Sequence, residues 1–231
     1  MIYVDNAATT QLDSDAYEAM KPYLIYDYGN ASSAYSFARN PKKALKKARS
    51  IIASSINTNS ENIFFTSGGT ESDNWAIKGI AFAQCKKGKH IITSQIEHHA
   101  ILNSCAFLES LGFDITYLPV DKSGYVLPTS LEKAIRKDTI LVSIMLANNE
   151  IGTIQNIKEL VAIAHAHGII FHTDAVQGVG HIHINVSDLN VDLLSASAHK
   201  FNGPKGIGFL YKKNDVNMQP YVHGGIQESQ M

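Results

Sequence analysis

Residues 191–211 read VDLLSASAHKFNGPKGIGFLY, two apolar runs that flank a polar loop with a lysine near its start. Similar apolar runs occur at residues 61–68, 90–95, 113–120, 139–147 and 169–175, and amphipathic stretches follow most of them. Strands buried on both faces and followed by helices are typical of a mostly parallel sheet that is covered on both sides. The sequence therefore predicts an α/β fold of three α/β/α layers around a seven-stranded sheet.

Two helices are expected before this core, at residues 14–24 and 41–56. Pro41 suits the first turn of the second helix, and we interpret its lysine-rich outer face as a solvated surface. Residues 219–231 contain Pro220 and the pair Gly224-Gly225 and are expected to form a strand that leaves the domain. The chain shows no repeat, low-complexity tract or linker, so the pattern itself draws no domain boundary.

The composition disfavours several classes of function. A chain of 231 residues that is 45% hydrophobic can bury one large core. Its 20 basic and 21 acidic residues give a net charge of −1, so the chain has no excess of positive charge that would attract nucleic acid or an anionic membrane surface. Two cysteines and an N-terminus without a leader pattern favour a reducing, cytoplasmic setting. The apolar stretch at 139–147 is far shorter than the roughly 20 residues of a membrane-spanning helix.

Polar residues that could carry chemistry directly follow the apolar runs. In an open parallel sheet, ligands bind beyond the carboxyl ends of the strands, so these are the positions where a site is expected. They are Ser67-Gly68-Gly69-Thr70, Glu97-His98, Asn148-Asn149-Glu150, Asp174 with Gln177, and Ser197 with His199-Lys200.

The glycine-rich segment at 67–70 lies between a predicted strand and a predicted helix. Free N–H groups and the positive end of a helix dipole at such a place can hold a phosphate. The same glycines could also serve only to make the turn. The chain has neither GxGxxG nor GxxxxGK[ST], which disfavours dinucleotides and nucleoside triphosphates as ligands.

Asp174 and Lys200 add two further candidates. A carboxylate at the end of a strand could hold a protonated ring nitrogen, or it could cap the next turn. A lysine directly after a buried strand can lose its charge by desolvation and form an imine, or it can be an ordinary surface charge. With the anion cradle at 67–70, the two residues supply the three anchors of pyridoxal 5'-phosphate, which are its phosphate, ring nitrogen and aldehyde.

The chain resembles the NifS/IscS cysteine desulfurases. The motifs that carry the resemblance appear in family order from residue 3 to about 228: DNAATT, GNASS, FTSGGTESDN, KHIITSQIEHHAIL, TILVSIMLANNEIG, HTDAVQGVG, SASAHKFNGPKGIGFLY and HGGIQE. The resemblance implies fold type I of the pyridoxal-phosphate enzymes and a homodimer with its site near the subunit interface. It also implies that residues 1–15 belong with a small domain, that 16–231 form the cofactor-binding large domain, and that the C-terminal small domain is absent.

The resemblance assigns roles to individual residues. Lys200 would form the imine with the cofactor and move the substrate Cα proton, and Asp174 would pair with the ring nitrogen. Gln177 would hydrogen-bond the ring hydroxyl, Asn149 would orient substrate and cofactor, and His98 would stack on the ring with a possible role in proton transfer to sulfur. The phosphate would be bound by Thr70, Ser197 and His199, with the backbone of Gly69.

The reaction implied is the conversion of L-cysteine to L-alanine, with sulfur passed to an enzyme thiolate and then to iron–sulfur clusters or tRNA thiolation. The family carries that thiolate and a substrate-binding arginine in the absent segment. One hypothesis is therefore a cysteine desulfurase that is inactive as this chain alone. Another is a non-catalytic or split-chain cofactor-binding module that needs a partner, and a third is an enzyme like selenocysteine lyase.

Cys85 and Cys105 match no family nucleophile, and we expect Cys105 to lie in the core. Cys85 ends a predicted helix beside Lys86 and Lys87, where a lowered thiol pKa is one interpretation and a plain structural position is the other. The histidines at 98–99, 181 and 183 lack the clustering of a metal site, so no metal is expected.

Overall fold

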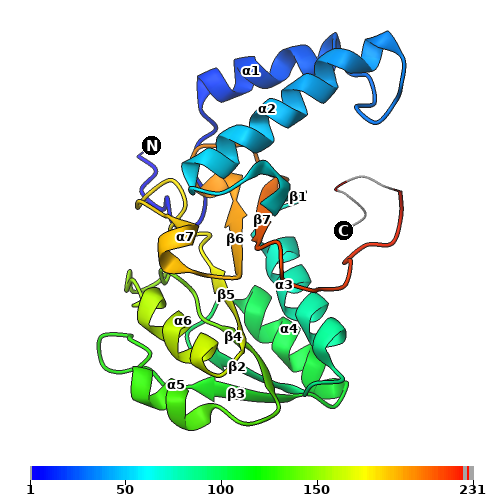
Figure 1. The fold of residues 1–231 in the computed structure, drawn as a ribbon. Coiled ribbons are helices and arrows are strands. Elements are labelled where there is room, and N and C mark those ends of the chain that lie inside the picture. Colours follow the sequence, from blue (N-terminus) through cyan, green and yellow to red (C-terminus); the bar gives the residue numbers. More distant parts are fainter. Residues whose placement is uncertain (1, 226–227, 229–231) are drawn as a thin grey trace.

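The computed structural model describes residues 2–225 and 228, and these form a seven-stranded sheet between two layers of helices (Figure 1). The strands are β1 (Ile63–Thr66), β2 (His90–Ser94), β3 (Asp114–Leu118), β4 (Thr139–Ser143), β5 (Ile170–Asp174), β6 (Leu193–Ser197) and β7 (Gly208–Lys212). The helices are α1 (Ser14–Ile25), α2 (Arg39–Ser55), α3 (Gly69–Gln84), α4 (His99–Ser110), α5 (Pro128–Ala134), α6 (Ile157–Ala166) and α7 (Val186–Leu189). The predicted fold class and all seven predicted strands are confirmed.

The strand order is β1-β7-β6-β5-β4-β2-β3; β7 runs antiparallel to β1 and β6, and the other pairs are parallel. β2, β4 and β6 are buried along their whole length, and β5 is buried from Phe171 onward, which explains why they read as continuous apolar runs. Because they are parallel, the residues that follow them meet at one edge of the sheet. That edge carries the candidate site.

Two apolar clusters hold the layers together. One joins α3 and α4 to one face of the sheet, through residues such as Trp75, Ile80 and Leu108. The other joins α5, α6, α7 and the end of α2 to the opposite face, with Phe171 as its largest fully buried side chain. Helices on both faces close a core that no single helix could bury.

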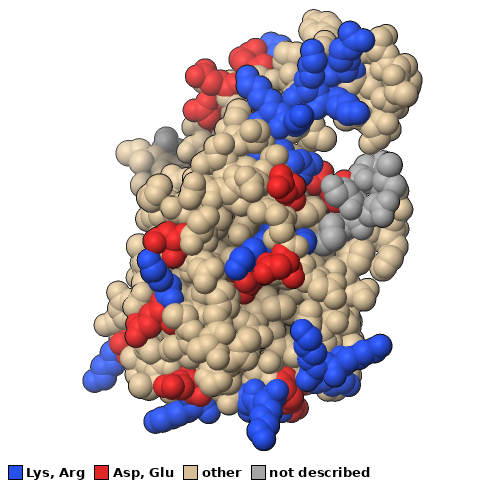
Figure 2. All heavy atoms as spheres, in the orientation of Figure 1, with Lys and Arg blue, Asp and Glu red and all other residues tan. Residues whose placement is uncertain are grey.

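α1 and the first half of α2 project away from this body (Figure 1). α1 has no buried residue, and it exposes Tyr17, Leu24 and Ile25. Figure 2 shows the lysines and arginines of α2 gathered at this end of the molecule, as the interpretation of a solvated basic face requires. Elsewhere in this view positive and negative side chains alternate.

Four local expectations differ from the structure. α2 begins at Arg39, so Pro41 lies inside its first turn, where the missing N–H breaks no helical hydrogen bond. The strand predicted at 139–147 ends at Ser143, because the chain leaves the sheet to bring residues 145–149 to the site. The short helix α7 was not predicted. Residues 219–225 form no strand, and residues 226–227 and 229–231 of the same prediction lie outside the described part of the chain.

Candidate active site

A cavity of about 290 Å³ opens where β5 and β6 end and α3 begins. It is lined by all nine residues that the sequence indicated for cofactor binding: Gly69, Thr70, His98, Asn149, Asp174, Gln177, Ser197, His199 and Lys200. These residues come from five separate segments of the chain. The sheet topology therefore brings together what the sequence places up to 131 positions apart (200 − 69).

The N-terminus of α3 forms one wall of the cavity. Thr66 at the end of β1 and Ser197 at the end of β6 both pair with Gly208, so the turn after β1 lies beside Ser197. A Cβ on Gly69 would come within 2.6 Å of the Val176 side chain, which explains why glycine is needed for this close approach. The first N–H groups of α3 have no acceptor within the helix and can donate hydrogen bonds to an anion.

A second hollow adjoins this wall and shares residues with the cavity. It is lined by Gly69, Thr70, Ser197 and His199, and it adds Lys205 and Glu71, whose carboxylate accepts a hydrogen bond from Ser67 N–H. Burial and the neighbouring charges of Lys200 and Lys205 lower the pKa of His199. Hydroxyl, imidazole and amide donors thus gather near Lys205, as suits a phosphate group.

Lys200 lies in the 3₁₀ turn Ala198–Lys200 that follows β6. Its Nζ donates hydrogen bonds to the backbone carbonyls of Ala7 and Ala8. Burial lowers the pKa of Lys200, and the negative charges of Asp174 and Asp5 oppose that shift. The lowered pKa increases the fraction of neutral amine at neutral pH, which is the form that attacks a carbonyl.

Asp174 ends β5 and is 5% exposed. Its Oδ1 accepts a hydrogen bond of 2.9 Å from the N–H of Val176, so it also caps the following turn. Burial raises the pKa of Asp174, while that hydrogen bond and the charges of His98 and Lys200 act in the opposite direction. Gln177 lies in a turn, and its Nε2 donates to Ala7 O at 2.8 Å.

His98 is the N-cap of α4, where its Nδ1 accepts a hydrogen bond of 3.1 Å from Ala100 N–H. This bond leaves Nε2 as the ring nitrogen able to act toward the cavity. Asn149 donates from Nδ2 to Glu150 at 3.0 Å. Its neighbour Asn148 has a structural role, because its side chain bonds the backbone of Ile96 and of Glu150.

Five lining residues were not predicted: Ala8, Asp73, Met145, Ala147 and Val176. Asp73 had a detectable signal, because it lies three, four and seven positions before the buried residues Ala76, Ile77 and Ile80 on one face of α3. Ala8 had no such signal in the sequence, because it is brought to the cavity by contacts with residues about 190 positions away.

Neither cysteine lines the cavity. Cys105 is fully buried, as predicted, and burial raises the pKa of its thiol to about 12. Cys85 is exposed at the end of α3. Within residues 2–225 and 228, no three histidine, cysteine or acidic side chains are grouped as metal ligands, and none of the helices there has the length and apolar character to cross a membrane.

Comparison with known proteins places this geometry in context. Residues 2–230 match the family described as aminotransferase class-V. The chain is 60% identical to the cysteine desulfurase IscS of Dictyoglomus turgidum, over 99% of this chain and 58% of the relative. It is 58% identical to the cysteine desulfurase IscS of Methanosarcina thermophila, over 98% of this chain and 56% of that protein.

Two solved structures share the fold closely. SspA in complex with cysteine superposes with a TM-score of 0.97 at 44% identity, covering all of this chain and 67% of that one. A structure titled NifS-like protein gives a TM-score of 0.97 at 42% identity, covering 99% of this chain and 63% of that one. The chain spans less than two thirds of the length of the curated relatives it matches.

Proposed function

This chain belongs to the aminotransferase class-V family, and on that premise we propose that it is the cofactor-binding part of a cysteine desulfurase. The reaction would take sulfur from L-cysteine and leave L-alanine. The observation that carries the proposal is the placement of Lys200, Asp174 and the start of α3 around one cavity. The 60% identity to a cysteine desulfurase over nearly the whole chain supports it.

The residues present fit pyridoxal 5'-phosphate, the cofactor on which class-V aminotransferases and cysteine desulfurases depend. The cavity joins a primary amine, a carboxylate that is 5% exposed and a helix N-terminus whose Gly69 leaves out the Cβ that would fill the cradle. These groups correspond in chemistry to the aldehyde, ring nitrogen and phosphate of the cofactor.

When bound, pyridoxal phosphate supplies an aldehyde that condenses with amines and a ring that withdraws electrons from the substrate. Asp174 would hold the protonated ring nitrogen, and Gln177 would donate to the ring hydroxyl. The phosphate would be bound by Thr70, Ser197 and His199, with the backbone of Gly69.

Lys200 would hold the cofactor and then carry a proton to and from the substrate Cα. Its desolvated amine favours this role, because a base with a pKa lowered toward neutrality can both accept and release the proton. His98 would stack on the cofactor ring. Its Nδ1 accepts a hydrogen bond from Ala100 N–H, so Nε2 would be the nitrogen that gives a proton to the leaving sulfur. Asn149 would orient the substrate.

The transfer of sulfur also needs a thiolate nucleophile. Cys105 is buried with a raised thiol pKa, and Cys85 lies outside the cavity, so neither is suited to that role. We propose that the thiolate comes from outside these 231 residues. The chain alone would then bind the cofactor without releasing sulfide, as a split-chain module would.

The remaining proposals concern partners and setting. A homodimer is supported by the exposed apolar side chains of α1, and a cytoplasmic setting by the two unpaired cysteines. The sulfur would pass to an iron–sulfur scaffold or another sulfur-acceptor protein, in keeping with the name IscS of the relatives.

The test is borohydride reduction of the purified chain with pyridoxal phosphate, followed by peptide mass mapping. We expect one reduced adduct, at Lys200, and its loss in Lys200→Ala. The matched control is Lys122→Ala, which removes an exposed lysine from the turn before Gly124. Lys122 does not line the cavity, so this variant should keep the adduct. A reducible adduct that persists in Lys200→Ala, or maps to another lysine, would overturn the assignment.

A further inference from the structure

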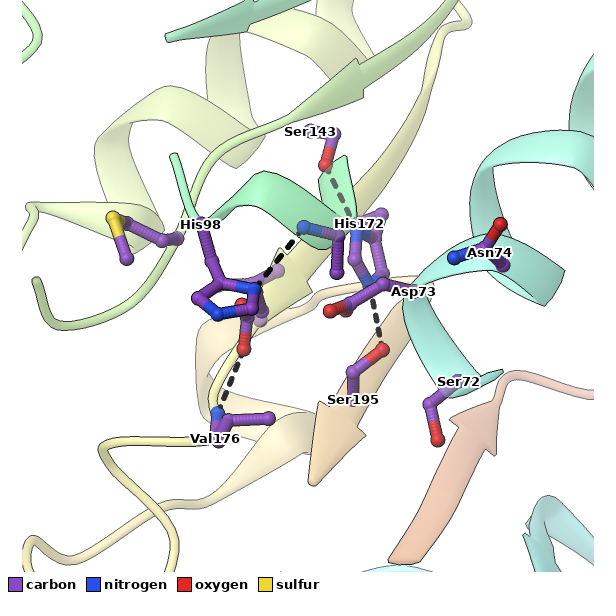
Figure 3. Close-up of polar contacts among 12 residues, drawn as sticks. Ser72, Asp73, Asn74, His98, Ser143, His172, Val176 and Ser195 are labelled. Carbon is purple, nitrogen blue, oxygen red and sulfur yellow. Dashed lines mark hydrogen bonds and ion pairs between the residues drawn. The ribbon is translucent and has the colours of Figure 1, made fainter. Parts of the chain in front are cut away.

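Buried polar side chains form a layer around His172, and one of them, Asp73, lines the cavity (Figure 3). Asp73 reaches from α3 toward His172 of β5, while Ser143 of β4 and Ser195 of β6 lie on the two sides of the imidazole. Asp73 is 1% exposed and the other three are fully buried. The cofactor roles proposed above use none of these four residues.

His172 is neutral in this layer. Its Nδ1 lies 2.9 Å from Ser143 Oγ and its Nε2 lies 3.0 Å from Ser195 Oγ. A neutral imidazole has one donor and one acceptor, and two hydroxyls can satisfy both. Burial lowers the pKa of His172 to about 3, so it provides no positive charge at neutral pH.

Asp73 consequently has no counter-charge in the part of the chain that the structure describes. His172 is the basic group that approaches it, with Nε2 lying 3.8 Å from Asp73 Oδ1. That oxygen is buried without a hydrogen-bond partner. An ionised carboxylate in such a place is strongly unfavourable, and a buried carboxyl normally takes up a proton instead.

Asp174 faces the same cavity but has a different environment. The N–H of Val176 donates to its Oδ1, and the charges of His98 and Lys200 favour its ionised form. Burial and the ionised Asp174 raise the pKa of Asp73 well above its usual range, while Ser195 acts in the opposite direction. Two carboxyls that share a desolvated site do not both ionise, and their environments decide which one keeps the proton.

Four further titratable groups act on Asp73 and Asp174 or lie beside them: Glu97, His98, His172 and Lys200. Glu97 Oε1 accepts hydrogen bonds from Ser94 Oγ at 2.6 Å and from Met145 N–H at 2.9 Å, and its Oε2 is buried without a partner. Burial raises the pKa of Glu97 to about 8. Glu97 is therefore mostly protonated at neutral pH, and Asp174 is the carboxylate whose charge acts on Asp73.

We infer that Asp73 stands in the cavity wall as a neutral carboxylic acid, so that Asp174 is the one ionised carboxyl beside the cofactor ring. The part of this inference that concerns the ring rests on the proposed function. The protonation of Asp73 rests only on its burial, its unpartnered oxygen and its neighbours. An amide should therefore replace Asp73 with little effect, whereas the same change at Asp174 should not be tolerated.

The direct test is infrared spectroscopy of the chain without cofactor at neutral pH. We expect a carbonyl stretch of protonated carboxylic acids that shifts on labelling with ¹³C-aspartate, which separates Asp73 from Glu97. Asp73→Asn should remove the aspartate band and Asp174→Asn should leave it. A wild-type protein without an aspartic acid band would overturn the inference, and this result does not depend on whether any variant folds.

The second test compares pyridoxal phosphate affinity in the matched variants Asp73→Asn and Asp174→Asn by absorbance titration. We expect Asp73→Asn to stay within about threefold of wild type and Asp174→Asn to bind at least about tenfold more weakly, because one pKa unit of lost charge pairing is a factor of ten. Equal loss in both variants would show that Asp73 acts as a charge. If the wild type binds no cofactor, the proposed function fails, while the infrared result still decides the state of Asp73.

Discussion

Lys200 Nζ lies 3.0 Å from the carbonyl oxygen of Ala8, although the two residues are 192 positions apart in the sequence. This contact belongs to a row of hydrogen bonds between residues 7–13, here called the N-terminal strap, and the loop at 199–202. Thr10 N–H donates to His199 O, and Asp13 N–H donates to Asn202 O, each at 2.9 Å. The backbone that carries the candidate cofactor lysine is therefore held by the N-terminal strap.

The first prediction concerns Thr10, which joins the strap to this loop. Its hydroxyl donates to His199 O at 2.9 Å and accepts from Asn202 N–H at 2.7 Å, and the residue is buried. Thr10→Val keeps the shape but leaves Asn202 N–H without its acceptor, so we expect a loss of about 1–3 kcal/mol in the free energy of unfolding. Urea denaturation measures this loss. Gln11→Ala, at an exposed neighbouring position, is the control and should change stability little.

The second prediction tests the close approach at Gly69. Gly69→Ala adds a Cβ at 2.6 Å from Val176 Cγ2, and it should displace Val176, whose N–H donates to Asp174. We expect a destabilisation of about 1–3 kcal/mol, as for an overpacked site, with weaker cofactor binding.

The double variant Gly69→Ala/Val176→Ala removes the clashing methyl groups and serves as the rescue. It should recover most of the lost stability and affinity, because alanine itself suits the first turn of a helix. If Gly69→Ala were harmless alone, or if the double variant were no better, steric contact with Val176 would not be the reason for glycine at this position. Urea denaturation and absorbance titration report the two quantities.

The third prediction concerns the pH dependence of stability through Glu97. Burial raises the pKa of this carboxyl from 4.5 to about 8, so between these values the folded chain binds more protons than the unfolded chain. Stability is then fully present below pH 4.5 and declines as pH rises toward 8, by at most about 1.4 kcal/mol per pH unit from this group.

Glu97→Gln carries no such proton and keeps an acceptor for Ser94 and Met145. Urea midpoints of the chain without cofactor at pH 5.5 and 7.5 should therefore differ less in Glu97→Gln than in the wild type. Glu132→Gln, an exposed change on α5, should keep the wild-type difference. An unchanged difference in Glu97→Gln would mean that Glu97 is ionised throughout this range.

The fourth prediction concerns the exposed apolar surface of α1. Leu24 and Ile25 are 66% and 53% exposed, beside the exposed rings of Tyr26 and Tyr28. Contiguous apolar surface of this kind favours association. Sedimentation velocity should show concentration-dependent association of the wild type, which Leu24→Lys/Ile25→Lys reduces. Ile151→Lys changes an equally exposed side chain on another part of the molecule and should not. A wild type that stays monomeric at all concentrations would contradict this prediction.

Much of the site could be predicted because it depends on residue types at strand ends. The apolar runs are continuous where strands are buried on both faces, and in a parallel sheet the residues after such strands meet at one edge. Asp174, Ser197 and Lys200 were found by this reasoning alone. The roles of individual residues came from the resemblance to the cysteine desulfurases, and they stay predictions, as does the division of the chain at residue 15.

The sequence by itself determined the layers, the strands and nine of the residues that line the cavity, since periodicity and strand-end position depend on local chain geometry. Only the tertiary structure decided how those residues are held in place and which of them carry a charge. The strap that binds Lys200 and the neutral layer of Asp73 and His172 depend on contacts between distant segments. Hydrogen bonding and desolvation set the charge of a buried group, and both are properties of its three-dimensional surroundings.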